Sequence, residues 1–411
     1  MADLEPQAWM TAGPTRKVMA ALHASGPARF VGGCVRDALL GRPLGDIDIA
    51  TPLTPPRVTR ALQAAGLKAV PTGVDHGTVT AIADGQPFEI TTLRRDVETD
   101  GRRAVVAFTT DWQEDAERRD FRLNALYLNE DGSILDPTGE GVADARAGRI
   151  VFVGEPETRI REDYLRILRF FRFYAWYGRG EIDAAGLAAC AARREGLKGL
   201  SGERVSKEML KLLAAEDPRP AVRLMAEAGV LGVLLPQAGD LTRLEGLVQI
   251  AAAEPLARDP VLRLAALLPA DVAAVRAAAG RLRLSNPQRD RLIAAAEGPP
   301  VPAAPMTLRE ARQALYRFGA DAFRDRIAVA WGAAGLTAAD CEWRGLLSYP
   351  DAWAPPAFPI TGEEIKAAGV PEGPLHGRVR REVEAWWIDA DFPADKAAAL
   401  ERLRAVVEGL E

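Results

Sequence analysis

Two aspartates separated by one residue, Asp46 and Asp48, are well suited to metal chemistry. They stand in the segment DIDIAT, where strand alternation places both carboxylates on one face and Ile47 and Ile49 on the other. Adjacent like charges repel and Asp disfavours strands, so fold stability does not explain the pair. A divalent cation does, because Mg²⁺ prefers carboxylate oxygens and stabilises phosphoryl transfer. The alternative is a solvated edge strand.

The segment before these aspartates contains a Gly-Gly turn that suits a phosphate. The sequence RFVGGCVRDALLG predicts a strand through Phe30 and Val31, a turn at Gly32 and Gly33, and a short helix closed by Gly41. Glycine backbone can approach a ligand closely, and N–H groups at a helix start attract anions. An isolated Gly pair is more often a plain tight turn, so this interpretation depends on the neighbouring aspartates.

A third carboxylate, Glu89, lies in the predicted strand PFEITTLR. Alternation places Glu89 and Thr91 opposite Phe88 and Ile90, so Glu89 is able to complete an acidic cluster with the aspartate pair. For an isolated Glu, a solvated strand face is as common.

Two later segments supply adjacent arginines and a carboxylate–arginine pair. The adjacent Arg118 and Arg119 of ERRDFRLNA are good phosphate ligands, although surface arginines usually bind none. The segment REDYLRILRFF predicts a helix with Asp163 and Arg166 at i and i+3, which either form an intrahelical salt bridge or face one ligand. A carboxylate and a guanidinium complement the amino donor and ring acceptor that cytosine and adenine share, and they mismatch uracil and guanine.

Together these segments resemble the signature motifs of class II tRNA nucleotidyltransferases and the related bacterial poly(A) polymerases, in the polymerase β superfamily. The motif RRDFRLNA departs from the family pattern at Arg122, where Thr is commoner. The resemblance implies that Asp46 and Asp48 ligate catalytic Mg²⁺ and that Glu89 joins them. It also implies nucleotide-binding positions, which are Gly32, Gly33, Arg36, Asp37, Arg118, Arg119, Asp120, Asn124, Asp163, Arg166 and Arg169.

Two further matches concern supporting elements. The segment LSGERVSKEMLKLL resembles a family motif in which Glu203 and Arg204 support the nucleotide-binding helix. Residues 94–103, polar with a turn at Asp100 and Gly101, resemble the family's flexible loop. CC-adding relatives lack much of that loop, so its presence favours complete CCA addition or A addition.

The elements that must position these residues change character along the chain. The first third mixes β-type runs with Gly and Pro turns, and from about Arg159 the sequence is rich in Ala, Leu and Arg with helical periodicity. We therefore predict an α/β head with a polymerase-β-like nucleotidyltransferase sheet, followed by all-α neck, body and tail domains. The predicted ranges are 1–150 for the head, 151–235 for the neck with base recognition, 236–300 for the body and 306–411 for a tRNA-binding tail. Pro-rich breaks at residues 299–305 and 350–359 are the predicted linkers.

Composition excludes several other classes of protein. The 411 residues carry a net charge of −5 and contain no apolar run of the ~20 residues that a membrane span needs. Three scattered cysteines and three histidines exclude a disulfide framework, a zinc site and a His-Asp phosphohydrolase module. The N-terminal segment has no apolar stretch typical of a secretory signal. We expect a cytoplasmic protein with reduced cysteines, no membrane partner and an undetermined oligomeric state.

The predicted function is addition of CCA to the 3′ end of tRNA from CTP and ATP, with release of pyrophosphate. A poly(A) polymerase shares the head but usually has a longer basic C-terminal extension, and an enzyme that adds only A is a further alternative. From a different class, a catalytically inactive RNA-binding protein also remains open, as does the identity of the general base. Candidate contacts with the tRNA backbone are the segment RLRLSNPQRDRL and Gly373, Pro374, Gly377 and Arg378.

Overall fold

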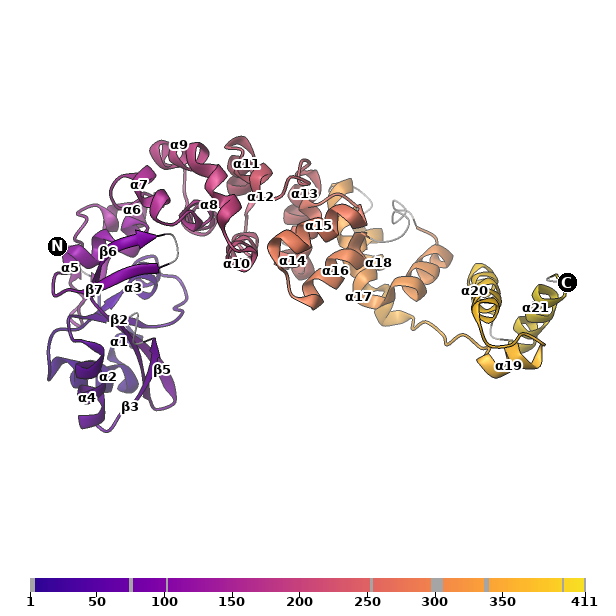
Figure 1. Ribbon diagram of the computed structural model, residues 1–411, viewed down its shortest axis with the longest axis horizontal. Coiled ribbons are helices and arrows are strands. Elements are labelled where there is room, and N and C mark those ends of the chain that lie inside the picture. Colours follow the sequence, from indigo (N-terminus) through magenta and orange to yellow (C-terminus); the bar gives the residue numbers. More distant parts are fainter. Residues whose placement is uncertain are drawn as a thin grey trace. The chain divides into compact units, whose positions relative to one another are not determined.

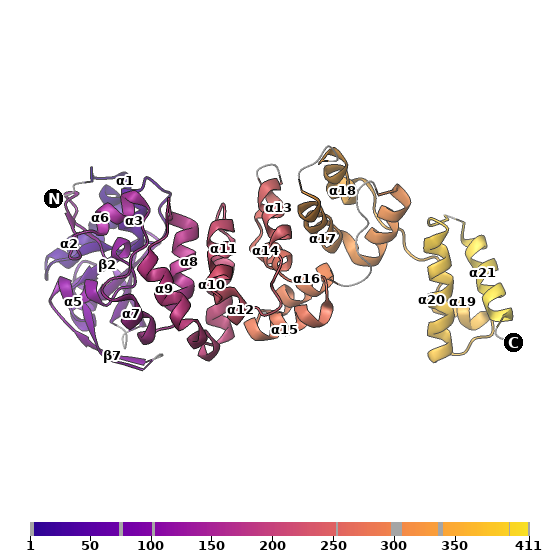
Figure 2. The ribbon, with the colours of Figure 1, turned by 90° about the horizontal axis from the view of Figure 1, so that it is seen from above.

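The computed structural model describes residues 4–73, 77–100, 103–251, 254–296, 306–335, 340–393 and 395–409 (Figure 1). The chain divides into two compact units, residues 1–236 and 237–411. All described strands lie in the first unit, and the regular elements described in the second unit are helices (Figure 2). The predicted fold class, a mixed α/β head followed by helices, is confirmed; the four-part division remains a prediction. No described helix is long and apolar enough to cross a membrane.

The head is built on a seven-stranded sheet in the order β3-β4-β5-β2-β1-β8-β9. Its neighbours pair antiparallel except β2 and β5, which run parallel. A separate two-stranded antiparallel sheet is formed by β6 and β7. The strands are β1 Arg29–Val31, β2 Asp48–Thr51, β3 Lys68–Gly73, β4 Thr78–Ala83, β5 Gln86–Thr92, β6 Arg94–Asp100, β7 Arg103–Phe108, β8 Tyr127–Leu128 and β9 Ile134–Leu135.

Helices α2 and α4 contact the sheet and share one apolar core with it. Leu22 of α2, Leu62 of α4 and the strand residues Ile49, Phe88 and Ile90 are fully buried there. Because alternate strand residues enter this core, the polar residues between them are directed to the opposite face. The head helices are α1 Ala8–Thr11, α2 Gly13–His23, α3 Gly33–Leu39, α4 Pro55–Ala64, α5 Trp112–Glu117 and α6 Gly141–Ala147, with a 3₁₀ turn η2 at Arg122–Asn124.

The rest of the first unit is a helical segment held to the head by aromatic rings. Phe170 of α8 stacks on Phe152 at 5.3 Å, and Phe173 meets Phe121 edge-on at 5.2 Å. Such pairs add stability beyond their burial and fix the start of α8 against the head. The helices are α7 Pro156–Glu162, α8 Leu165–Tyr177, α9 Ala184–Arg193, α10 Gly202–Leu213, α11 Arg219–Glu227 and α12 Val230–Leu234, with η3 at Arg194–Gly199.

The second unit is organised around its longest helix, α17. This helix crosses α13 closely at glycine: a Cβ added at Gly246 would lie 1.8 Å from the carbonyl oxygen of Gly332. Inside α17, Gly319 has φ 76° and ψ 168°, a conformation that favours glycine and kinks the helix. The helices are α13 Thr242–Ile250, α14 Pro260–Leu267, α15 Val272–Leu282, α16 Asn286–Ala296, α17 Leu308–Ala334, α18 Asp340–Ala352, α19 Gly362–Ala367, α20 Pro374–Asp389 and α21 Lys396–Glu408, with η4 at Pro255–Arg258.

One predicted linker differs from the structure, and the other is not tested by it. Pro350, expected in a linker, lies inside α18, so the irregular segment begins only after Ala352. Residues 299–305 of the other predicted linker lie outside the described residues. The three cysteines are free, in agreement with the sequence, with Cys34 and Cys190 buried and Cys341 exposed.

Candidate active site

The predicted catalytic carboxylates come from two neighbouring parallel strands. Asp48 opens β2 and is the register partner of Glu89 on β5, while Asp46 lies in the extended segment just before β2. Ile47 and Ile49 are 4% and 0% exposed, whereas Asp46 and Glu89 are exposed and Asp48 is half-buried. The predicted alternation is therefore confirmed, although β2 begins at the second aspartate and not the first.

The electrostatics of this face favour a cation. Burial, followed by the charges of Glu89 and Asp46, raises the pKa of Asp48 from 3.8 to about 6. Within the described part of the chain, no three His, Cys, Asp or Glu side chains converge into a complete metal cage. Mg²⁺ is commonly held by one or two carboxylates together with substrate phosphates, so the two aspartates fit an ion that arrives with a nucleotide.

The Gly-Gly turn has the predicted strand, turn and helix arrangement. Gly32 ends β1 with φ 72° and ψ −121°, and α3 begins at Gly33. A Cβ at Gly32 would lie 3.4 Å from Nη1 of Arg119. Glycine is needed here because the positive φ disfavours other residues. The turn thereby comes close to one arginine of the ERRDFRLNA segment.

The two adjacent arginines of that segment are both held by Asp115, a residue that the sequence analysis did not select. The Asp115 carboxylate is 1% exposed and accepts hydrogen bonds from Arg118 Nη2 at 2.7 Å and Arg119 Nη2 at 3.0 Å. It also accepts from the Tyr127 hydroxyl at 2.6 Å and from the backbone N–H of Arg94 at 3.2 Å. Burial opposes the charged form, but Arg119 and Arg118 outweigh it and lower the pKa of Asp115 to about 2. The i, i+3 and i, i+4 spacing was the available sequence signal.

A second network joins the head to α8. Asp120 accepts a hydrogen bond from Nδ2 of Asn124 at 3.0 Å and from Nε of Arg169 at 2.7 Å. Burial opposes ionisation, yet Arg169 and the hydrogen bonds bring the pKa of Asp120 to about 2. Arg169 and Arg172 also face the buried carboxylate of Glu208 on α10, with Arg172 Nε donating at 2.6 Å. The structure thus brings together the predicted nucleotide residues Asp120, Asn124 and Arg169, and the charges of Asp120 and Arg169 are paired.

Arg36 extends this network, because it donates hydrogen bonds to three different residues. Its Nη1 donates to Oδ1 of Asn124 at 2.7 Å, its Nε donates to Asp37 at 2.9 Å and its Nη2 donates to the Tyr177 hydroxyl at 2.6 Å. Tyr177 was not selected from sequence. Its spacing of four and eight residues from Phe173 and Arg169 on one helix was the available signal.

The predicted base-reading pair is arranged differently from the expectation. Helix α7 ends at Glu162, and Asp163 has φ −153° and ψ 106°, so it lies in a break before α8. Asp163 accepts from the Leu165 N–H at 3.1 Å and from Arg204 Nη2 at 2.7 Å. The prediction of one continuous helix here is wrong, because the extended backbone of Asp163 interrupts it. The contact of Arg204 with Asp163 agrees with the prediction that Arg204 supports the nucleotide-binding helix.

Arg166 does not pair with Asp163. It forms an ion pair with Glu162, and it donates to the carbonyls of Arg159 at 2.6 Å and Arg118 at 3.3 Å. The alternative interpretation, an intrahelical salt bridge between Asp163 and Arg166, is therefore wrong. Both side chains nevertheless belong to the junction of head and α8 where the arginine cluster lies.

The predicted flexible loop is largely a β-ribbon. Residues 94–100 form β6 and pair with β7, while the predicted tip at Gly101 lies outside the described residues. The backbone contact of Arg94 with Asp115 ties the start of this ribbon to the arginine cluster.

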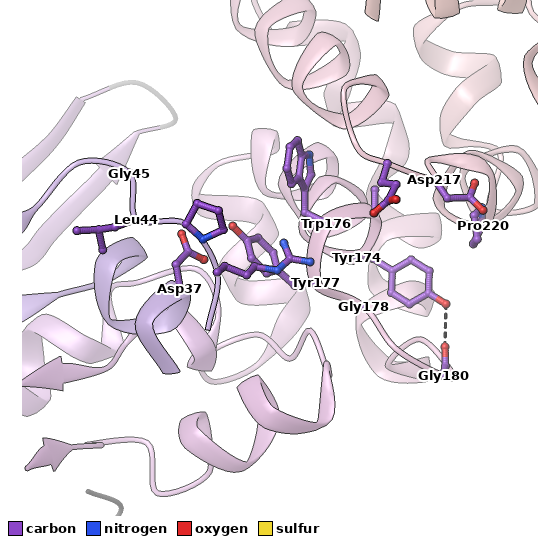
Figure 3. Close-up of a pocket in the computed structure, with 14 residues that line it drawn as sticks. Asp37, Leu44, Gly45, Tyr174, Trp176, Tyr177, Gly178, Gly180, Asp217 and Pro220 are labelled. Carbon is purple, nitrogen blue, oxygen red and sulfur yellow. Dashed lines mark hydrogen bonds between the residues drawn. The ribbon is translucent and has the colours of Figure 1, made fainter. Parts of the chain in front are cut away.

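A cavity of about 930 Å³ lies beside these networks, and of the predicted site residues only Asp37 lines it (Figure 3). Its head side is the loop at residues 42–45, which leads directly into Asp46. Its other side is the end of α8 and the segment before α11. The cavity is therefore adjacent to the predicted catalytic residues, not formed by them.

Comparison with known proteins assigns the head and part of the helical region to recognised families. Residues 28–151 match the family described as "Poly A polymerase head domain", and residues 181–241 match "Probable RNA and SrmB- binding site of polymerase A". The chain is 33% identical over 391 residues to "CCA tRNA nucleotidyltransferase 1, mitochondrial" of Mus musculus, covering 92% of this chain and 86% of that protein. It is 42% identical over 212 residues to "CCA-adding enzyme" of Geobacillus thermodenitrificans, covering 51% and 50%.

Among solved structures, the chain resembles the CCA-adding enzyme of Bacillus stearothermophilus in complex with CTP. The TM-score is 0.73 at 28% identity, and the match covers 97% of this chain and 100% of that one.

Proposed function

Because this chain belongs to the family of CCA-adding tRNA nucleotidyltransferases, we propose that it adds C, C and A in turn to the 3′ end of tRNA. The observation that carries this function is the full-length likeness to a CCA tRNA nucleotidyltransferase, together with the parallel register of Asp48 and Glu89. The substrates are tRNA, CTP and ATP, and pyrophosphate is released at each step. The protein is a transferase, and its catalytic residues all lie in the first unit.

The proposed metal-holding residues are Asp46 and Asp48, with Glu89 on the neighbouring strand completing the negative face. The chemistry that bound Mg²⁺ supplies there is neutralisation of the triphosphate and activation of the tRNA 3′-hydroxyl. The three carboxylates, on an exposed face next to the Gly32 turn, set the place where that hydroxyl meets the α-phosphate. The raised pKa of Asp48, caused first by burial and then by the charges of Glu89 and Asp46, supports this, because a bound cation offsets the repulsion among the three carboxylates.

The proposed phosphate and ribose cradle consists of residues already fixed in place. Arg118 and Arg119 are held by Asp115, and Arg36, Asn124, Asp120 and Arg169 form one connected set. Preorganised donors of this kind stabilise developing charge without reorganisation. Gly32, Gly33 and Asp37 complete the proposed nucleotide site at the turn.

The proposed template for the base is Asp163 with Arg166. Each carboxylate oxygen of Asp163 already accepts one hydrogen bond and has a second lone pair to offer to the amino group of C or A. Arg166 uses three of its N–H groups in the hydrogen bonds that the structure describes, and a guanidinium has five. Both members therefore retain capacity for one base edge.

The test is a turnover assay with tRNA that ends at the discriminator base. Each NTP is offered alone, and then CTP and ATP are offered together. The expected products are two C residues with CTP alone and a complete CCA end with both nucleotides. Growth of a long A tail would instead identify a poly(A) polymerase, the second candidate, whose name appears in the description of the matched head-domain family. Incorporation of only a terminal A on tRNA ending in CC would identify an A-adding enzyme.

We further propose that the protein acts in the cytoplasm. The supporting observation is that the three cysteines are free, because a reducing compartment keeps thiols in the reduced form. Since the Mus musculus relative is named as mitochondrial, fractionation followed by immunoblotting is the appropriate check.

A further inference from the structure

The cavity next to the catalytic segment shares only Asp37 with the nucleotide site proposed above, and the rest of its lining has no part in the function derived so far. Its volume of about 930 Å³ is at the upper end for ligand pockets, which span roughly 300 to 1,000 Å³. Gly45 lines it and Asp46 is the next residue, so a ligand in the cavity lies alongside the segment that carries the catalytic carboxylates. Arg118, Arg119 and Arg169 of the nucleotide cradle do not line the cavity. Arg36 connects the cradle to the cavity wall, because it donates hydrogen bonds to Asp37 and Tyr177.

One wall of the cavity carries an exposed aromatic ring that is held in place. Trp176 is 38% exposed, and its indole N–H donates to the carbonyl oxygen of Lys211 at 2.7 Å. The hydrogen bond satisfies the polar edge of the indole and fixes the ring, while a substantial part of its surface stays open. Figure 3 shows Trp176 and Tyr177 on this side of the cavity, with Asp37, Leu44 and Gly45 of the head opposite, whereas the Tyr174 side chain points away to the carbonyl oxygen of Gly180. An immobilised aromatic ring of this kind suits stacking of a planar group.

Arg42 is the cation in the lining of the cavity, and the acids there are Asp37, Glu216 and Asp217. Asp217 is bound by Arg219 at 2.7 Å and Asp37 by Arg36 at 2.9 Å, so guanidinium groups offset these two acids. Arg42 contacts the face of Tyr177, with its Cζ 4.5 Å from the ring centroid. Among the described residues, Arg42 has no carboxylate within ion-pairing distance, so its charge remains available for a phosphate.

We propose that this cavity binds an unpaired nucleotide of the tRNA acceptor end, with its base against Trp176 and its phosphate at Arg42. A fixed ring for stacking plus a cation for the backbone is the general mode of binding single-stranded nucleic acid. With Arg42 as the cation of its lining, the cavity suits the one phosphate that each nucleotide of a strand carries better than the triphosphate of a free nucleotide. The inference rests on the proposed function and adds residues to it: Trp176 and Arg42 hold the acceptor strand, and the arginine cradle holds the incoming nucleotide.

The test measures the binding of fluorescently labelled acceptor-stem minihelices by anisotropy, with the full-length protein. One minihelix has an unpaired 3′ end of three nucleotides and the other is blunt. Trp176→Ala is expected to weaken binding of the overhang minihelix by about 5- to 150-fold, the range for loss of one stacked base. Binding of the blunt minihelix and the KM for CTP should stay within twofold of wild type. Arg42→Ala should also weaken overhang binding and should reduce its salt dependence by about one phosphate contact.

A matched control is Arg60→Ala, which removes one exposed arginine from α4 of the same unit and does not line the cavity. It should leave both minihelices unaffected. Equal weakening of the blunt and overhang minihelices by Trp176→Ala and Arg42→Ala, or no weakening of either, would overturn the proposal. An increased KM for CTP or ATP with unchanged minihelix binding would also overturn it, because the cavity would then hold a free nucleotide.

If circular dichroism shows that Trp176→Ala is unfolded, the same binding measurements on Arg42→Ala and Trp176→Leu test the proposal in its place. The proposed function fails separately, through absence of nucleotide incorporation by the wild-type protein.

Discussion

The carboxylate face of the head and the arginine networks beside it differ in how their charges are compensated. On the strand face, burial, followed by the charges of Glu89 and Asp46, raises the pKa of Asp48 to about 6. In the arginine networks, Asp115 and Asp120 are buried beside guanidinium groups and their pKa values fall to about 2. In the first region the carboxylates face one another, whereas in the second each of the two carboxylates is paired with guanidinium groups. Binding of metal is therefore expected to change the first region, whereas the second is a scaffold already set for substrate.

The largest expected effect comes from removing one of the carboxylates of the strand face. Asp46→Ala or Asp48→Ala should reduce incorporation of CTP by at least about 10³-fold, since metal stabilisation is worth several kcal/mol. tRNA affinity should stay nearly intact because it depends on remote basic residues. Single-turnover incorporation and tRNA anisotropy measure the two quantities, with Glu130→Ala as a surface control. A near-normal rate in either aspartate variant would contradict the metal assignment.

The next effect separates base reading from structural support at the break before α8. Asp163→Ala should lower the ratio of kcat/KM for CTP over UTP by about 5- to 150-fold, the value of one good base contact. Its ion-pair partner provides the comparison: Arg204→Ala removes the same contact but leaves the carboxylate, so its selectivity should fall less. If both variants lose stability alike and keep the wild-type ratio within about twofold, Asp163 is only a structural partner of Arg204.

A smaller effect, on protein stability at low pH, is expected from the arginine networks. The pKa of Asp115 is lowered on folding, so its contribution to stability is present above pH 3.8 and is lost as the pH falls from there through about 2. The contribution is about 2 kcal/mol, and Asp115→Asn should lose it at neutral pH and show less further destabilisation between pH 4 and 2. Acid titrations followed by circular dichroism give both curves. Parallel curves for the two proteins would contradict the assignment.

The smallest effect concerns the contact of Tyr177 with Arg36. Tyr177→Phe keeps the ring and removes the hydroxyl, which accepts from Arg36 at 2.6 Å. Loss of one hydrogen bond to a charged group is worth about 1.5 to 3 kcal/mol at most, and Arg36 retains Asn124 and Asp37, so we expect a rise in the KM for CTP of about 2- to 10-fold. The kcat should change little. A fall in kcat without a change in KM would place Tyr177 in the chemical step.

By itself the sequence determined those features that depend on local periodicity. Alternation in DIDIAT and PFEITT predicted which residues are buried, and the Gly-Gly segment predicted the strand, turn and helix around Gly32. The resemblance of the motifs predicted the family. These features follow from the chain because strand alternation and the freedom of glycine act over a few residues.

Only the tertiary structure decided which charged groups are partners. Asp163 pairs with Arg204, 41 residues away, instead of with Arg166 on its own segment, and Tyr177 meets Arg36 across 141 residues. The parallel pairing of Asp48 with Glu89 likewise depends on the order of the strands in the sheet. Local spacing allows several ion pairs of similar small energy, and the packing of α8 against the head and α10 selects among them, because burial makes a well-placed partner worth far more than an exposed one.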